Sequence, residues 1–124
     1  MSKRSIESYI PQAIDTLQET FGKEKIPSEY NGYISAFGAS VIQSGLKPTL
    51  ALFENDSAQS KSEKKKLITI MLHVLLGKKS TERSLLAYVL ANNESLLKPK
   101  ILDVAVAVKL SIRTFSLNKG ERDE

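Results

Sequence analysis

Residues 33–54, YISAFGASVIQSGLKPTLALFE, decide the fold because they hold most of one helix, a turn and a second helix. Apolar residues recur there at intervals of three and four, which is the spacing of one helix face. Ser28 is a suitable N-cap, so we expect the first of these helices to run from Ser28 to about Ser44. Its expected inward-facing residues are Tyr33, Ile34, Phe37, Val41 and Ile42.

The turn within this stretch is predicted from one glycine. Gly45 ends the helix, because glycine adopts the left-handed conformation that closes a helix. Leu46 would supply the apolar contact of a Schellman cap. Pro48 suits the first turn of a further, short helix that extends to about Glu54.

Helical patterns continue on both sides of this stretch. Apolar residues from Ser5 to Phe21 predict an N-terminal helix, which either kinks at Pro11 or begins near it. Downstream, Ser60 and Glu63 form a capping-box pattern that opens a helix to about Leu76, which Gly77 closes. Ser80 is the expected cap of a fifth helix that frays at Asn92 and Asn93. Its expected inward-facing residues are Leu85, Leu86, Val89 and Leu90.

The C-terminal segment fits two patterns. Residues 104–113 alternate between valine, leucine or isoleucine and smaller or polar residues, which is the period of a strand. A helix that begins at Pro99 would also carry an apolar stripe. We favour the helix, because an isolated strand needs a partner. The sequence therefore predicts an all-α fold, a single compact bundle of about five to six helices over residues 1–124, with residues 118–124 as a frayed tail.

Composition excludes several kinds of site. The 124 residues contain no Cys and one His, so disulfides, thiolate chemistry and histidine metal clusters are absent. Residues 77–81, GKKST, lack the earlier glycine of a phosphate-binding loop, and lysine follows the Gly-Lys pair. His73 lies in an apolar run and is expected to be a buried, hydrogen-bonded side chain. We expect no enzyme activity, no cofactor and no metal site.

No membrane segment is expected either. The most apolar run, residues 67–77, is far shorter than the roughly 20 residues of a membrane span. The first 15 residues are polar and lack the apolar core of a signal peptide. We therefore expect a cytoplasmic protein.

Positive charge is concentrated in one part of the chain. The formal net charge is +4, but residues 57–113 carry +7, whereas residues 1–56 carry −2 and residues 114–124 carry −1. Such asymmetry favours a basic face that meets a polyanion. A solvated helix face without a ligand would have the same composition. The candidate nucleic-acid contacts are Lys61, Lys64, Lys65, Lys66, Lys78, Lys79 and Arg83.

The stretch from Tyr33 to Glu54 resembles the small α-helical subunit of type III-B CRISPR effectors, the Cmr complex. That family carries an amphipathic helix followed by Gly-Leu-x-x-Thr-Leu-Ala and an aromatic or apolar residue. The matching positions here are Gly45, Leu46, Thr49, Leu50, Ala51, Leu52 and Phe53. The family often ends in a helix with a Trp and a Lys-Arg pair, and this chain departs from that pattern because it has no Trp.

The resemblance implies a non-catalytic subunit of an RNA-guided antiviral ribonucleoprotein. Such a subunit would stack, in a few copies, along the guide–target RNA duplex and contact its backbone through a basic face. Its partners would be other CRISPR effector subunits, guide RNA, target RNA and further copies of itself. Guide pairing supplies sequence discrimination in such complexes, so a protein that reads backbone and shape suffices.

Two other functions remain open from the sequence. One is a helical protein–protein adaptor that does not bind nucleic acid. The other is a DNA-binding regulator with a helix-turn-helix around Gly45. The helix after Gly45 carries Thr49, Leu50, Leu52 and Phe53, which offer few donors for reading base edges.

Overall fold

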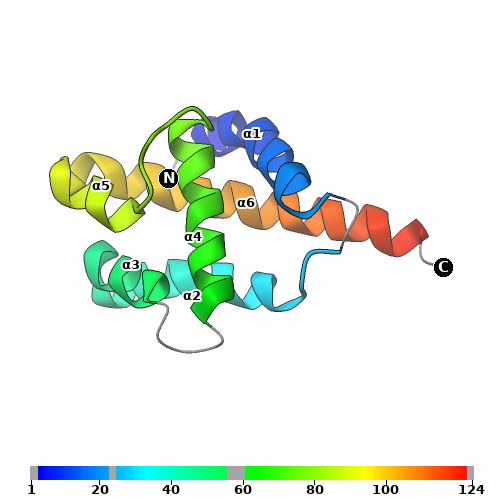
Figure 1. The fold of residues 1–124 in the computed structure, drawn as a ribbon, viewed down its shortest axis with the longest axis horizontal. Coiled ribbons are helices and arrows are strands. Elements are labelled where there is room, and N and C mark those ends of the chain that lie inside the picture. The colour runs from blue at the N-terminus through cyan, green and yellow to red at the C-terminus, as the bar shows by residue number, and fades with distance from the viewer. Residues whose placement is uncertain (1–2, 23–24, 56–60, 123–124) are drawn as a thin grey trace.

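The computed structural model describes residues 3–22, 25–55 and 61–122, without the side chains of residues 61–62 and 115–122. Within these residues there are six helices and no strand, which confirms the all-α prediction. The helices are α1 (Lys3–Phe21), α2 (Glu29–Ser44), α3 (Leu46–Glu54), α4 (Lys61–Leu76), α5 (Leu85–Ala91) and α6 (Glu94–Arg122) (Figure 1).

Helix α6 is the long axis of the bundle, and α4 crosses it. Helices α1 and α2 both pack against α6, and α4 contacts α1, α2, α3 and α6 (Figure 1). The short helices α3 and α5 gather at the end of the molecule where α6 begins. In Figure 1 the segment that connects α4 to α5 leaves α4 beside α1 and runs toward the end of the molecule where α3 lies.

The core is centred on α4. This helix buries six apolar side chains that point in several directions: Leu67, Ile68, Ile70, Met71, Leu72 and Val74. Burial of a side chain of this size contributes roughly 1.5–3 kcal/mol, so packing on more than one side holds α4 firmly. The charged residues of α4 are confined to its first turns, between Lys61 and Lys66.

The two glycine turns are confirmed. Gly45 has a φ of 100° and its amide donates to the carbonyl of Val41 at 3.0 Å. Gly77 has a φ of 89° and donates in the same way to His73 at 2.9 Å. Leu46 is fully buried directly after the first turn, but Gly45 has a ψ of 162°, so the turn is not the left-handed Schellman cap that the sequence predicted. An L-residue at either glycine would be strained.

The α2–α3 hairpin is also joined by side-chain hydrogen bonds. Thr49 on α3 is buried, and its hydroxyl donates to the carbonyl of Gly45 at 2.8 Å. The same oxygen lies 2.7 Å from the hydroxyl of Ser40 on α2. Thr49 therefore acts inside the fold, whereas α3 exposes Pro48, Ala51 and Leu52.

The predicted cap of the fifth helix is wrong. Helix α5 starts at Leu85, and the hydroxyl of Ser84 accepts a hydrogen bond from the amide of Ala87 at 3.1 Å. Ser80 instead accepts from the amide of Glu82 at 3.1 Å, which closes a local turn. Both serines can bond a nearby amide, so the sequence alone did not separate a helix cap from a turn.

Other start signals had mixed outcomes. Ser28 directly precedes α2 as expected, but its side chain makes no capping hydrogen bond. Ser60, the proposed cap of α4, lies outside the described residues. Pro11 sits inside α1, which starts before it and runs through it.

Two residues predicted to face inward are exposed. Ile42 is 70% exposed and Leu90 is 62% exposed. Each directly follows a buried valine, and one residue turns a helix by about 100°. The buried side of each helix is narrower than the apolar pattern suggested. His73 is half-buried, which corrects the expectation of a buried histidine.

The C-terminal segment is helical, as favoured. Helix α6 starts at Glu94, five residues before Pro99, and the Asn93 side chain accepts from the amide of Ser95 at 2.9 Å. Val104, Ala105, Ala107 and Val108 are all buried, because α6 packs against helices on more than one side. Because so much of the circumference of α6 is buried, its sequence carries apolar residues in the alternating pattern that is also typical of a strand. Fraying of residues 118–124 stays a prediction.

Candidate nucleic-acid interface

The lysines at the start of α4 do not share one face. Each residue turns the helix by about 100°, so Lys64, Lys65 and Lys66 point in three directions. Lys64 lies toward α2 and α3, Lys66 lies toward α1, and Lys65 lies on the side of α5. These three consecutive lysines therefore lie on different sides of α4 and do not form one basic surface.

Lys64 covers two aromatic rings. Its ammonium nitrogen lies 5.5 Å from the ring centre of Tyr33 and 5.4 Å from that of Phe53. Phe53 in turn meets Phe37 edge-on, with ring centres 5.5 Å apart. A cation over an aromatic face is attracted by the electron density of the ring. Lys64 therefore helps to join α4 to α2 and α3.

Lys66 makes a similar contact on the other side. Its nitrogen lies 4.9 Å from the ring centre of Phe21, at the end of α1. Phe21 meets the fully buried Tyr30 edge-on, with ring centres 5.4 Å apart. We call these lysine–ring contacts of Lys64 and Lys66, which lie on different sides of the helix, together the aromatic flank of α4.

A buried tyrosine fixes the start of α4 to α2. The hydroxyl of Tyr30 donates to the carboxylate of Glu63 at 2.6 Å. Burial raises the pKa of Tyr30 well above its ordinary value, and the hydrogen bond and charge of Glu63 raise it further. Glu63 is therefore engaged within the fold, close to the lysines.

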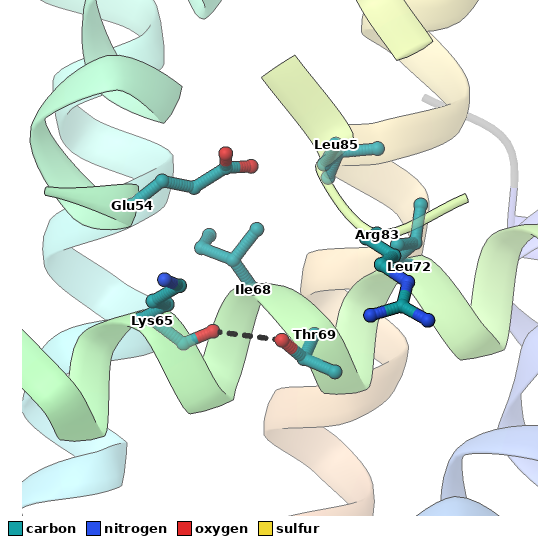
Figure 2. Close-up of a pocket in the computed structure, with 7 residues that line it drawn as sticks. All are labelled: Glu54, Lys65, Ile68, Thr69, Leu72, Arg83 and Leu85. Atoms are coloured by element: carbon teal, nitrogen blue, oxygen red, sulfur yellow. Dashed lines mark hydrogen bonds between the residues drawn. The ribbon is translucent and has the colours of Figure 1, made fainter. Parts of the chain in front are cut away.

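Lys65 lines a shallow cleft between α4 and the start of α5, which we call the α4–α5 cleft. It is lined by Glu54, Lys65, Ile68, Thr69, Leu72, Arg83 and Leu85 (Figure 2). Ile68, Leu72 and Leu85 are buried and form its apolar base, whereas Lys65, Thr69 and Arg83 are exposed. The cleft thus combines two cations with an apolar floor.

The one acid in the α4–α5 cleft is committed to the fold. The carboxylate of Glu54 accepts from the hydroxyl of Ser84 at 2.6 Å and from the amide of Leu86 at 3.0 Å. It therefore occupies the amino end of α5, where a negative charge is favourable. These contacts also fix Ser84, the residue next to Arg83.

Lys78 is held by two acids of α1. Its nitrogen lies 2.5 Å from Asp15 and 2.5 Å from Glu19. The hydrogen bonds to Asp15 and then to Glu19 raise the pKa of Lys78. Lys78 and Lys79 do not lie at a helix start, because α5 begins only at Leu85.

The structure thus separates the seven predicted basic residues. Lys65 and Arg83 lie together in the α4–α5 cleft, and Lys79 is exposed in the following connection. Lys64, Lys66 and Lys78 have partners inside the fold. Lys61 opens α4, but its side chain lies outside the described residues.

Sequence reasoning missed Glu54 and Thr69 as parts of the cleft. Thr69 follows Lys65 by four residues, so the helical spacing would have placed both on one face. Glu54 had no such signal, because its partner Ser84 lies 30 residues away and belongs to a cap that was assigned to Ser80.

Among the residues that the structure describes, no group of three or more His, Asp or Glu side chains is placed to hold a metal ion. No helix in the same residues combines the length and apolarity needed to cross a membrane.

A family model described as "CRISPR-associated protein (Cas_Cmr5)" matches residues 6–103, which covers α1 to α5 and the first part of α6. No curated protein matches the chain, and no solved structure does.

Proposed function

Because the chain belongs to the Cas_Cmr5 family of CRISPR-associated proteins, and is thus a small subunit associated with the type III-B Cmr complex, we propose a role in holding RNA there. In this proposal the protein is a non-catalytic, cytoplasmic part of an RNA-guided antiviral ribonucleoprotein. It stacks along the guide–target RNA duplex, beside further copies of itself, and contacts the backbone through a basic face. Other subunits carry the chemistry of cleavage.

The family match over residues 6–103 carries this proposal. The distribution of charge supports the RNA contact, because residues 57–113 hold a net charge of +7. Phosphate groups attract such a surface regardless of base sequence, and guide pairing provides the specificity. The candidate contacts remain Lys61, Lys64, Lys65, Lys66, Lys78, Lys79 and Arg83.

Purification of the tagged full chain from its native host tests the role in a ribonucleoprotein. We expect Cmr subunits to co-purify together with RNA of a defined length. Mild ribonuclease treatment should release the RNA without removing the subunits, since protein contacts hold the assembly. Recovery of the subunits without any RNA would contradict the proposed function.

Binding of isolated protein to RNA tests the basic face. We expect weak binding that falls steeply with salt, because counterions are released from each phosphate contact. Replacing Lys64, Lys65 and Lys66 together by Glu should abolish it. Unchanged affinity of that triple variant would overturn the assignment of RNA contacts to this part of the chain.

One observation favours a second function, a protein–protein adaptor within the complex. Lys64, Lys66 and Lys78 all have partners inside the fold, so a large share of the basic cluster has a structural use. An adaptor would join Cmr subunits and show no salt-dependent RNA binding. The two functions are therefore separated by the RNA-binding measurement alone.

A further inference from the structure

We propose that the solvent-facing side of α6 is a docking surface for a segment of another Cmr subunit, and that this segment is apolar in its centre and acidic at its edges. The inference rests on the association with Cmr subunits in the proposed function, and it does not depend on the RNA contact. It assigns a protein-binding surface to a helix that carries none of the candidate RNA contacts.

Helix α6 has apolar residues on its solvent-facing side as well as on its buried side. Helices α1, α2 and α4 pack against it (Figure 1), and Val104 and Val108 are buried in the core that they form. The side that these helices leave open carries apolar residues spaced three or four apart, as on one face of a helix. We call this row the outer stripe, and its members are Leu96, Pro99, Leu102, Val106 and Leu110.

The outer stripe is accessible along its whole length. Leu96 at one end is 66% exposed, and Leu110 at the other end is 41% exposed. Pro99 is exposed as well, and Leu102 and Val106 are half-buried. At 1.5 Å per residue, the stripe extends over roughly 21 Å. Apolar side chains that gather in such a row on a surface are typical of a site that another protein covers.

The exposed charges beside the outer stripe all have the same sign. Four cations of α6 lie within one turn of it: Lys98, Lys100, Lys109 and Arg113. None of the four has an ion-pair partner among the described side chains. The one acid in residues 95–114 is Asp103, which is 4% exposed and interacts with Tyr9 of α1. The edges of the stripe therefore favour an acidic partner.

Two other occupants fit the outer stripe less well. RNA would offer phosphates to the cations, but its backbone has no apolar surface to cover the leucines. A second copy of this chain that paired α6 with α6 would bring like charges together, because cations lie near both ends of the stripe. An acidic, apolar protein segment covers the leucines and pairs with the cations at once.

Photo-cross-linking in the native host tests this surface. The tagged full chain carries p-benzoylphenylalanine in place of Leu96 or Leu110. A control chain carries it in place of Ile42 on α2, which is 70% exposed and lies outside the outer stripe. Co-purified Cmr subunits and RNA are measured first, and the sample is then treated with ribonuclease and irradiated. Mass spectrometry identifies the cross-linked peptides.

We expect positions 96 and 110 to cross-link to one segment of a Cmr subunit other than this chain, with apolar residues and an excess of Asp and Glu. Position 42 should not cross-link to that segment. The variant K109E/R113E should lower the yield from position 96 by about tenfold, because acids would then face acids. The matched control K109R/R113K keeps both charges and should keep the yield, and circular dichroism confirms that both variants are helical.

Several results would overturn the docking surface and leave the proposed function standing, if Cmr subunits and RNA still co-purify. They are cross-links to nucleotides, to a second copy of this chain or to a protein outside the Cmr assembly, and no cross-link from either stripe position. Capture of the same segment from position 42, or an unchanged yield in K109E/R113E, would also overturn it. The expected cross-links in a complex without RNA would contradict the proposed function and support the surface.

Discussion

On the aromatic flank of α4, Lys64 and Lys66 lie over the rings of Tyr33, Phe53 and Phe21. In the α4–α5 cleft, Lys65 lies with Arg83 around an exposed hydroxyl and an apolar floor. The three lysines are consecutive in sequence and identical in type. The difference shows that consecutive lysines on a helix can meet quite different surroundings, according to the helical rotation.

The largest loss of stability is expected when the Phe53 ring beneath Lys64 is removed from the aromatic flank. Phe53 is 3% exposed and packs edge-on against Phe37. We expect Phe53→Ala to lower the free energy of unfolding by about 3–5 kcal/mol, because it leaves a cavity as well as an uncovered cation. Urea denaturation measures the change. A loss below about 1 kcal/mol would show that this side of the bundle repacks freely.

The buried tyrosine beside this flank gives a smaller effect with a clear pH dependence. Tyr30→Phe removes a hydrogen bond to the carboxylate of Glu63, and we expect a loss of about 1.5 kcal/mol near neutral pH. Equilibrium unfolding in urea at pH 7 measures this loss.

The pH dependence of Tyr30 follows from its raised pKa. The unfolded tyrosine ionises at its ordinary value of 10.0, while burial and Glu63 keep the folded one neutral. The contribution is therefore complete below pH 10 and is lost as the pH rises above it. The stability of Tyr30→Phe should fall less steeply between pH 9.5 and 11. Identical slopes in that range would contradict this account of Tyr30.

The arrangement of the α4–α5 cleft can be disturbed without replacing either of its cations, Lys65 and Arg83. Glu54→Gln removes the charge that caps α5, and we expect a loss of about 1 kcal/mol in unfolding free energy. The same variant should weaken RNA binding by several-fold, because Arg83 is then less firmly placed. Thermal unfolding and RNA anisotropy measure the two effects. Weaker stability with unchanged RNA affinity would contradict the positioning role of Glu54.

Removing the cations of the aromatic flank should cost about as much stability as Glu54→Gln. Exposed cation–π contacts contribute about 0.5–1 kcal/mol each, so K64Q/K66Q should lose about 1 kcal/mol in urea denaturation. K65Q/R83Q, with the same change in charge, should stay within about 0.5 kcal/mol of wild type. Equal free energies of unfolding for K64Q/K66Q and K65Q/R83Q would contradict the stabilising role of Lys64 and Lys66.

Much of the fold could be predicted from local signals. Gly45 and Gly77 marked two helix ends correctly, since few other residues adopt a positive φ. The cap of α5 and the start of α6 could not be read so simply. They depend on Glu54, which reaches Ser84 across 30 residues, and on packing that tolerates Pro99 inside a helix.

The candidate site was predictable in composition but not in arrangement. The sequence located the basic excess in residues 57–113, which include Lys65 and Arg83. It could not show that Lys64 and Lys66 lie over rings from α1, α2 and α3, because those contacts join distant parts of the chain. Helical rotation separates the lysines, but only the tertiary packing identifies what each one meets.

The most direct test separates the aromatic flank, with Lys64 and Lys66, from the α4–α5 cleft, with Lys65 and Arg83. It compares the salt dependence of RNA binding by K64Q/K66Q and K65Q/R83Q, measured side by side on one RNA. Both variants lose two positive charges, so net charge cannot distinguish them. We predict that the slope of log affinity against log salt falls by about 1.4 in K65Q/R83Q and stays at the wild-type value in K64Q/K66Q. Equal slopes in the two variants, or the larger fall in K64Q/K66Q, would contradict the division of α4.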